Sequence, residues 1–215
     1  GEADRIITIL TNDHGKIRLL AKGVRKIKSR LAGGIELFSV NDITYIVGKG
    51  DLGTLISSRL QKNFGNIVKN IDRTMFAYDV LKLVNRITED SPEPEYFVML
   101  SNALEAINDQ DNSIDIIRLW MNMQLLKLGG HSPNLITDSE GNKLDANQKY
   151  AFGFEEMAFS MQPNGPFQAN HIKMLRLAIT ASSASKLTNV QDADKVVISL
   201  GQLSRSMLQQ HARTT

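Results

Sequence analysis

Seven basic side chains and no acidic one lie in the fifteen residues from Lys16 to Arg30. Dense positive charge without neighbouring carboxylates attracts polyanions, because each cation that meets a phosphate releases a condensed counterion. Residues 1–65 carry eleven Lys and Arg against six Asp and Glu, whereas residues 66–215 carry fourteen against seventeen. This asymmetry predicts a phosphate-binding amino-terminal part. Its basic members are Lys16, Arg18, Lys22, Arg25, Lys26, Lys28 and Arg30.

The alternative is an ordinary solvated strand and surface loop, since lysine and arginine are mostly exposed in any protein. The lack of a carboxylate within the segment makes that alternative weaker than usual. The aromatic residues that could stack on bases are few here, namely Phe38, Tyr45 and Phe64. The pattern therefore favours tracking of a phosphate backbone by charge over readout of bases.

The segment from Gly48 to Gly53 has the spacing G-x-G-x-x-G. A dinucleotide site needs this spacing between a strand and a helix, whose amino-terminal amides face the pyrophosphate. Residues 54–57 (T-L-I-S) are instead typical of a strand, so we expect a hairpin turn. The chain has no G-x-x-x-x-G-K-[ST] motif, and an ATPase would lack its phosphate loop.

No pattern indicates a catalytic residue, a metal ligand or a cofactor site. Asp138–Asn142 with Asp145 resembles a calcium loop only weakly, and turn chemistry explains these residues equally well. No G-x-S-x-G motif supports a nucleophilic serine. The chain has no cysteine, which excludes disulfides, thiolate catalysis and thiolate zinc sites. The four histidines show no metal-ligand spacing and stand at positions 14, 131, 171 and 211.

Short apolar and alternating runs over the first 65 residues predict five strands. Regular turns between them indicate a small barrel or sandwich. The expected strands are Arg5–Thr11, Lys16–Lys22, Ile35–Val40, Ile43–Val47 and Leu52–Leu60.

After Gly65 the apolar period becomes that of helices. A first helix has its apolar stripe at positions 67, 71, 75, 78, 81, 84 and 87, and a second starts at Ser91-Pro92. A third, over 113–128 and around Trp120, is apolar nearly all round and should be central. Two more are expected over 170–181 and 190–213, the latter opened by a capping box of Thr188 and Gln191. Residues 131–168 are expected to be irregular, with a hairpin turn at 138–142.

The fold class is thus α+β, an amino-terminal barrel over 1–64 followed by a helical domain over 65–215. No apolar run approaches the length that spans a bilayer, so we expect no membrane contact and a cytoplasmic protein.

The chain resembles the bacterial recombination-mediator family RecO, strongly over residues 1–60 and diffusely beyond them. The matching segments are 1–11 (GEADRIITILT), 14–16 (HGK), 21–25 (AKGVR), 28–31 (KSRL), 48–52 (GKGDL) and 125–130 (LLKLGG) before Pro133. The resemblance implies an amino-terminal OB-fold barrel. The family's barrel has one more strand before the position of Gly1, so an opening strand is expected to be missing. Many members hold a four-cysteine zinc site, which residues 138–167 do not offer.

The resemblance also implies a role in DNA repair without enzymatic chemistry. Such a protein binds single- and double-stranded DNA, anneals complementary strands and helps to load a recombinase with RecR, in association with the nucleoid. It would also dock on the acidic tail of single-stranded-DNA-binding protein (SSB). Carried onto this chain, the DNA contacts are the seven basic residues above, with Lys26 included from charge alone. The candidate tail site is Arg118 with Leu119 and Met123.

Two other classes stay open. The chain could be an adaptor whose basic loop binds an acidic protein partner, which competition between oligo-dT and an acidic peptide would reveal. It could also be a hydrolase with an undetected site, which turnover of generic esters or nucleotides would reveal.

Overall fold

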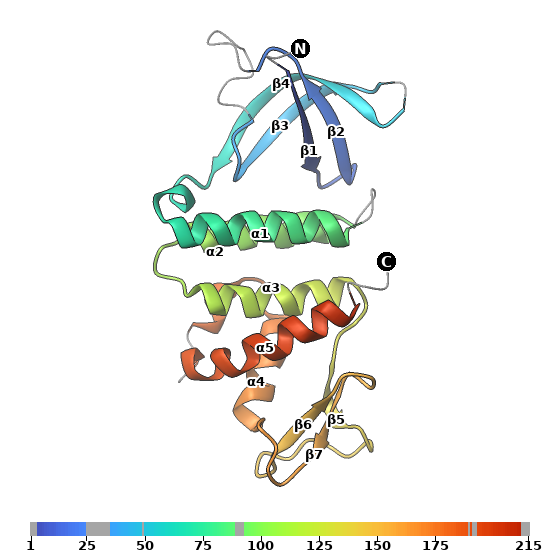
Figure 1. Cartoon of the computed structure of the whole chain (residues 1–215), viewed down its shortest axis with the longest axis vertical. Helices are drawn as coiled ribbons and strands as arrows, with labels where there is room; N and C mark the ends of the chain where they lie inside the picture. The colour runs from blue at the N-terminus through green and yellow to red at the C-terminus, as the bar shows by residue number, and fades with distance from the viewer. Residues whose placement is uncertain are drawn as a thin grey trace. The chain divides into compact units, whose positions relative to one another are not determined.

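The computed structural model describes residues 4–24, 35–48, 50–88, 93–188, 190 and 193–211. The chain divides into two compact units, Gly1–Asn108 and Asp109–Thr215. Figure 1 shows strands and helices in both units, and the α+β class is confirmed. The strands of unit 1 end at Asn63 and helices follow, as expected. A domain boundary between residues 64 and 65 stays a prediction, because unit 1 also includes two helices.

Unit 1 begins with a four-stranded sheet in the order β1-β2-β4-β3. β2 and β4 run parallel, whereas β1 with β2 and β3 with β4 run antiparallel. β1 and β3 are the two edges, so the described strands form an open sheet of the expected OB type. Its strands are β1 (Arg5–Leu10), β2 (Lys16–Ala21), β3 (Ser39–Ile46) and β4 (Leu52–Asn63).

The two strands expected over Ile35–Val40 and Ile43–Val47 are a single strand, β3, in the structure. The Asn41-Asp42 pair, expected to separate them, lies inside β3 rather than in a turn. The ladder to β4 shifts register between Val40 and Asn41 and again between Thr44 and Tyr45. These irregularities let β3 bend without ending. A turn-forming residue pair therefore gave a wrong boundary here.

The core of the sheet comes from alternate residues of each strand. Leu19, Ala21 and Leu55 are buried, and partly buried aliphatic side chains of β1 and β3 pack against them. Successive side chains of a strand point to opposite faces, so the intervening residues face away from this core. The residues that pack around the buried three are Ile7, Ile9, Ile17, Val24, Ile35, Ile43 and Tyr45.

The glycine-rich segment connects β3 to β4, which confirms the expected hairpin and not a dinucleotide loop. A Cβ at Gly48 would clash with the carbonyl oxygen of Leu52. Gly50 has a φ of +85°, in the region that favours glycine. A Cβ at Gly53 would lie 2.8 Å from Leu19 Cδ2. Each glycine is thus explained by backbone geometry and close packing.

A short 3-10 turn, η1 (Ile67–Lys69), follows the sheet. Two helices then complete unit 1, α1 (Ile71–Ile87) and α2 (Pro94–Asn108). α2 begins at the second of two nearby prolines, while the expected start at Ser91-Pro92 lies outside the described residues. The carboxamide of Asn70 caps α1 by accepting the Arg73 N–H.

The expected buried face of α1 is partly wrong. Ile71 and Met75 are exposed, whereas Phe76, Ala77 and Val80 are buried together with Arg73. The buried face is rotated because a small alanine and an arginine occupy it. The Arg73 guanidinium donates to the carbonyl oxygen of Ile107 in α2 at 2.9 Å, so burial does not leave that charge unsatisfied.

Unit 2 is built around α3 (Ile114–Leu128), which is buried nearly all round and confirms the expected central helix. Trp120 Nε1 donates to the carbonyl oxygen of Ala181 at 3.0 Å. The Gln124 amide donates to the carbonyls of Ala178 at 2.6 Å and Ile179 at 3.0 Å. Both side chains thereby satisfy the carboxyl-terminal carbonyls of the next helix, α4 (Ala169–Thr180).

The last helix, α5 (Ala193–His211), packs on α3 and α4. The capping box expected at Thr188 is wrong, because α5 starts five residues later. The Thr188 hydroxyl donates to the Ser185 carbonyl at the end of η2 (Ala184–Leu187), and Gln191 lies outside the described residues.

The region expected to be irregular, 131–168, instead holds a three-stranded sheet in the order β5-β7-β6. Its strands, β5 (Asn134–Asp138), β6 (Tyr150–Gly153) and β7 (Ala158–Met161), are too short to give a clear alternation. The turn expected at 138–142 is confirmed. The Asp138 carboxylate accepts the backbone N–H of Glu140 at 3.0 Å and of Asn142 at 2.8 Å, which is turn chemistry.

A histidine in the first turn of α4 should make the free energy of unfolding depend on pH. Gln168 donates its backbone N–H to His171 Nδ1 at 3.1 Å, and burial lowers the pKa of His171 below its usual 6.5. Burial and then His131 lower the pKa of His211 as well. Because the folded state disfavours protonated His171, the contribution of the neutral imidazole to the free energy of unfolding is fully present above pH 6.5. That contribution is lost as the pH falls from 6.5 through the lower pKa of the folded state.

We therefore expect a smaller free energy of unfolding at about pH 5.5 than at about pH 7.5, measured by urea denaturation. H171Q should reduce the difference, because glutamine can keep the cap without titrating. An unchanged difference in H171Q would assign the pH dependence to other groups.

Candidate nucleic-acid interface

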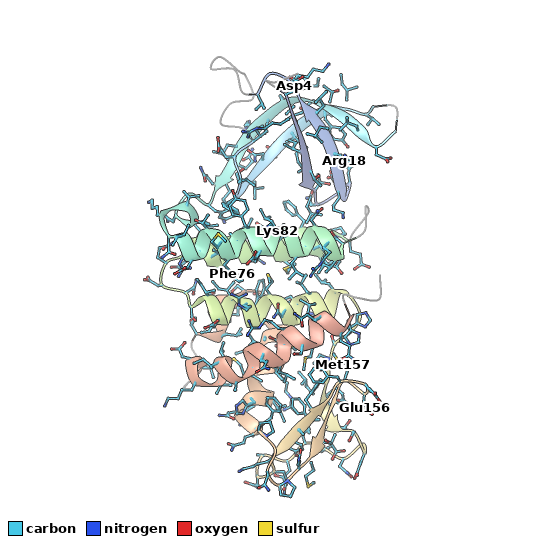
Figure 2. The ribbon with its side chains drawn as sticks, viewed as in Figure 1. Asp4, Arg18, Phe76, Lys82, Glu156 and Met157 are labelled. Carbon is cyan, nitrogen blue, oxygen red and sulfur yellow. The ribbon has the colours of Figure 1, made fainter. Side chains whose placement is uncertain are left out.

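The two predicted basic residues of β2, Lys16 and Arg18, have different environments. Ile17, Leu19 and Ala21 face the core, so Arg18 points to the opposite, outer face and is exposed. Arg18 is paired in register with Thr8 of β1 and Leu52 of β4. Figure 2 shows Arg18 at the surface of the sheet. Within the described part of the chain it forms no ion pair, so its charge is available to a ligand.

Lys16 has a different environment. Its ammonium group donates to the carbonyl oxygens of Thr88 at 2.6 Å and Asn85 at 3.1 Å, at the carboxyl end of α1. A cation there satisfies carbonyls that have no partner within the helix and interacts favourably with the helix dipole. The predicted DNA contact Lys16 thus joins the sheet to α1 in this structure.

Lys16 and Arg18 should therefore respond differently to methionine substitution. K16M should lower the free energy of unfolding by about 1–2 kcal/mol, because it leaves two carbonyls without their charged donor. R18M should change stability by less than about 0.5 kcal/mol and should weaken DNA binding more than K16M does. Urea denaturation and fluorescence anisotropy with labelled oligo-dT measure the two effects. Equal effects on stability would contradict this assignment of roles.

Lys22 is exposed at the turn that follows β2. Nearby, Asp4 accepts the Gly23 backbone N–H at 2.7 Å. This hydrogen bond is the main cause that lowers the pKa of Asp4, and the charge of Lys22 contributes further. Lys22 is thus partly offset by one carboxylate, but it forms no ion pair among the residues described.

The other four predicted cations, Arg25, Lys26, Lys28 and Arg30, lie outside the described residues. Where ion pairs are seen in the described ranges, they involve other groups: Lys62 with Glu105 at 2.7 Å and His14 with Asp13 at 2.9 Å. The helices of unit 1 therefore bring no described carboxylate into an ion pair with Arg18 or Lys22.

The outer face also contains exposed aliphatic side chains, whose positions the sequence pattern predicts to be strands without predicting that they are exposed. Ile6 and Ile46 are 57% and 62% exposed, and Leu52 is 36% exposed. Strict alternation along R-I-I-T-I-L indicates that Ile6 faces away from Ile7 and Ile9. Alternation could therefore have predicted the exposure of Ile6, but the run is almost entirely apolar and does not show which of its faces is buried.

The candidate tail site lies in unit 2. Arg118 is half-buried on α3, whereas Leu119 and Met123 are fully buried in the core. The two apolar residues thus support α3 from within and have no surface to offer a partner in this conformation.

Among the described residues, no group of three or more His, Asp or Glu is placed to hold a metal ion. In the same ranges, no helix combines the length and the apolar character needed to cross a bilayer.

Comparison with known proteins gives two family matches along the chain. The model described as "Recombination protein O N terminal" matches residues 1–64, and that described as "Recombination protein O C terminal" matches residues 68–213.

Curated relatives carry the name "DNA repair protein RecO". The one from Dehalococcoides mccartyi is 34% identical over 136 residues, covering 63% of this chain and 53% of that protein. The one from Acetivibrio thermocellus is 34% identical over 135 residues, covering 62% and 53%. The one from Trichodesmium erythraeum is 29% identical over 222 residues, covering 98% and 74%. The matched region thus spans about half the length of the first two relatives. With both family models matched in order over nearly all its residues, the chain belongs to the recombination protein O family, whose curated relatives are named as DNA repair proteins.

Proposed function

We propose that this chain binds DNA through its basic amino-terminal segment and acts as a recombination mediator without chemistry of its own. It would anneal complementary strands and help to load a recombinase onto single strands coated by SSB. The observation that carries this proposal is the run of seven cations without a carboxylate, of which Arg18 lies exposed and without an ion pair in the described part of the chain.

Annealing follows from charge. Two complementary strands repel each other because each carries one charge per phosphate, and a carboxylate-free cluster of cations screens both strands at once. Screening needs no base recognition, so the effect should be similar for different sequences. It should also weaken steeply with added salt.

The experiment mixes two complementary labelled oligonucleotides, with and without the protein, and follows duplex formation by energy transfer. We expect a faster rate with the protein, falling as salt increases. The same assay with SSB-coated strands tests the mediator role. A rate equal to that of the naked strands at low salt would contradict the proposal.

For protein partners we propose RecR and the acidic tail of SSB. Arg118 is the proposed partner of a tail carboxylate, and it lies on the helix whose Leu119 and Met123 are buried in the core. An R118A variant should lose tail-peptide affinity and keep its affinity for oligo-dT, as measured by anisotropy with each probe.

The second candidate function is an adaptor that binds an acidic protein. The exposed aliphatic side chains beside Arg18 favour it, since an acidic peptide with apolar residues would match them. Competition decides between the two: an acidic peptide should displace labelled oligo-dT only weakly if DNA is the ligand. Complete displacement at equal concentration would favour the adaptor.

A further inference from the structure

The helix α1 has two apolar faces, of which only one is buried. The second face is an exposed stripe of three residues, the α1 stripe: Ile71 is 72% exposed, Met75 57% and Tyr78 38%. These residues are four and three positions apart, so they are neighbours on one side of the helix. Figure 2 shows the buried Phe76 and the exposed Lys82 on different sides of α1. A surface helix needs one apolar face to pack on its own chain, so the second face indicates a further contact.

Large exposed apolar residues are concentrated on α1. Of the other helices in the described ranges, α2 and α5 have one each, Val98 and Ile198, and α3 and α4 have none. Single exposed apolar residues are common on protein surfaces and need no explanation. Three in a row on one helix, with Val68 just before the helix 64% exposed as well, are typical of an interaction surface.

Charged residues flank the α1 stripe in a definite order. Asp72 is three positions before Met75, whereas Lys82 and Arg86 follow Met75 by seven and eleven positions. Asp79 lies between them and is a neighbour of Lys82 on the same helix. All four charged residues are exposed, and none forms an ion pair within the described part of the chain. The outer charges are therefore acidic before Met75 and basic after it.

This order of charges is self-complementary when two copies of the helix run antiparallel. About a two-fold axis, each contact between two different residues occurs twice, once in each direction. If the helices cross near Met75, Ile71 of each copy lies beside Tyr78 of the other. Asp72 of each copy then lies toward Lys82 of the other, so the acidic end of one stripe meets the basic end of the second.

We propose that the α1 stripe is the interface between two copies of this chain, packed antiparallel about a two-fold axis. Charge complementarity selects a second copy as the occupant, because the acidic and basic ends match only in this orientation. A dimer carries two basic amino-terminal segments, one for each of two DNA strands. That consequence rests on the proposed function, whereas the interface itself does not.

The first test measures self-association of the whole chain. A contact made by one pair of helices is small for a specific interface, so we expect a weak dimer with a dissociation constant on the order of 10 µM. Sedimentation velocity over a range of about 1–300 µM protein brackets that constant.

The apolar part of the interface is tested by I71Q, which keeps a good helix former at this position. I71Q should weaken the dimer about tenfold, because the residue occurs twice in the interface. The matched control is I198Q on α5, since Ile198 is also 72% exposed. It should leave the dissociation constant unchanged. Circular dichroism checks that both variants fold.

The charged part is tested by exchanging charges between copies. D72K alone and K82E alone each replace two attractions across the axis by two repulsions, so each should weaken dimerisation about tenfold. A mixture of the two variants restores both attractions. Mixed dimers should therefore form with about the affinity of the unsubstituted chain, and a folding defect in either variant could not produce that recovery.

A chain that sediments as a monomer over the whole range would overturn the inference, assign the stripe to another kind of partner and leave the proposed function intact. A dimer that I71Q leaves unchanged, or that I198Q weakens equally, would overturn it by placing the contact elsewhere. A mixture of D72K and K82E that dimerises no better than either variant alone would overturn it as well, because the antiparallel pairing requires the recovery.

Discussion

Replacement of Arg25, Lys26, Lys28 and Arg30 by alanine should lower the affinity for single-stranded DNA by about 10²–10³-fold at about 0.1 M salt. Each phosphate contact on a single strand contributes about 0.7 to the slope of log K against log salt concentration. Four lost contacts therefore remove about 2.8 logarithmic units at this concentration. Because the loss is one of charge, all DNA sequences should weaken alike.

The control for this variant removes the same charge elsewhere. Lys143, Lys149, Lys173 and Lys186 are exposed in unit 2, and their joint replacement by alanine should change the affinity by less than about fivefold. Anisotropy with labelled oligo-dT measures both variants. If the first variant kept its affinity and the second lost it, the binding site would lie in unit 2.

The second large effect concerns the stability of unit 2. W120A should lower its free energy of unfolding by about 4 kcal/mol, the usual cost of removing a buried tryptophan. Trp120 is 1% exposed, and its indole N–H donates to the Ala181 carbonyl at the end of α4. The substitution therefore leaves a cavity, and the Ala181 carbonyl keeps only the longer hydrogen bond that the Gln124 amide donates at 3.4 Å. That is a large share of the roughly 5–15 kcal/mol that stabilises a typical protein.

Two variants separate the causes. W120F keeps most of the buried ring and loses the hydrogen bond, so it should cost about 1–2 kcal/mol. I198A on the exposed side of α5 should cost less than about 0.5 kcal/mol. Urea denaturation followed by circular dichroism measures all three, because tryptophan fluorescence is lost in the first two. A cost below about 1 kcal/mol for W120A would contradict the central place of α3.

Local chemistry explains what the sequence could predict. Ile17, Leu19 and Ala21 alternate with Lys16, Arg18 and Lys22 apart from Leu20, which predicted the buried face of β2, and three glycines predicted a hairpin. The almost continuous apolar run around Trp120 indicated the central helix. In each case, the residues that determine the element are neighbours in sequence.

Partners distant in sequence explain what the sequence could not predict. The role of Lys16 depends on Asn85 and Thr88, about seventy positions away. The buried face of α1 includes Arg73 because Ile107 in another helix accepts its hydrogen bond. The small sheet of unit 2 has strands of four and five residues, which give too few alternations for detection.

The candidate site was predicted in part. The density of cations predicted a site at the first strands. Alternation along β2 predicted that Arg18 faces away from the core, and Arg18 is exposed there. The aliphatic members of the outer face were missed, because an apolar residue in a strand is normally assigned to the core. Only the pairing of Ile6 with Leu20 and of Arg18 with Leu52 shows that these residues share a surface.

The most direct test of the central claim is the affinity for a labelled single strand across a salt series, measured by fluorescence anisotropy. If about five of the seven cations contact phosphate, the slope of log K against log salt concentration should be about −3.5. A slope near zero would show that phosphates contribute nothing to binding, and would contradict the account.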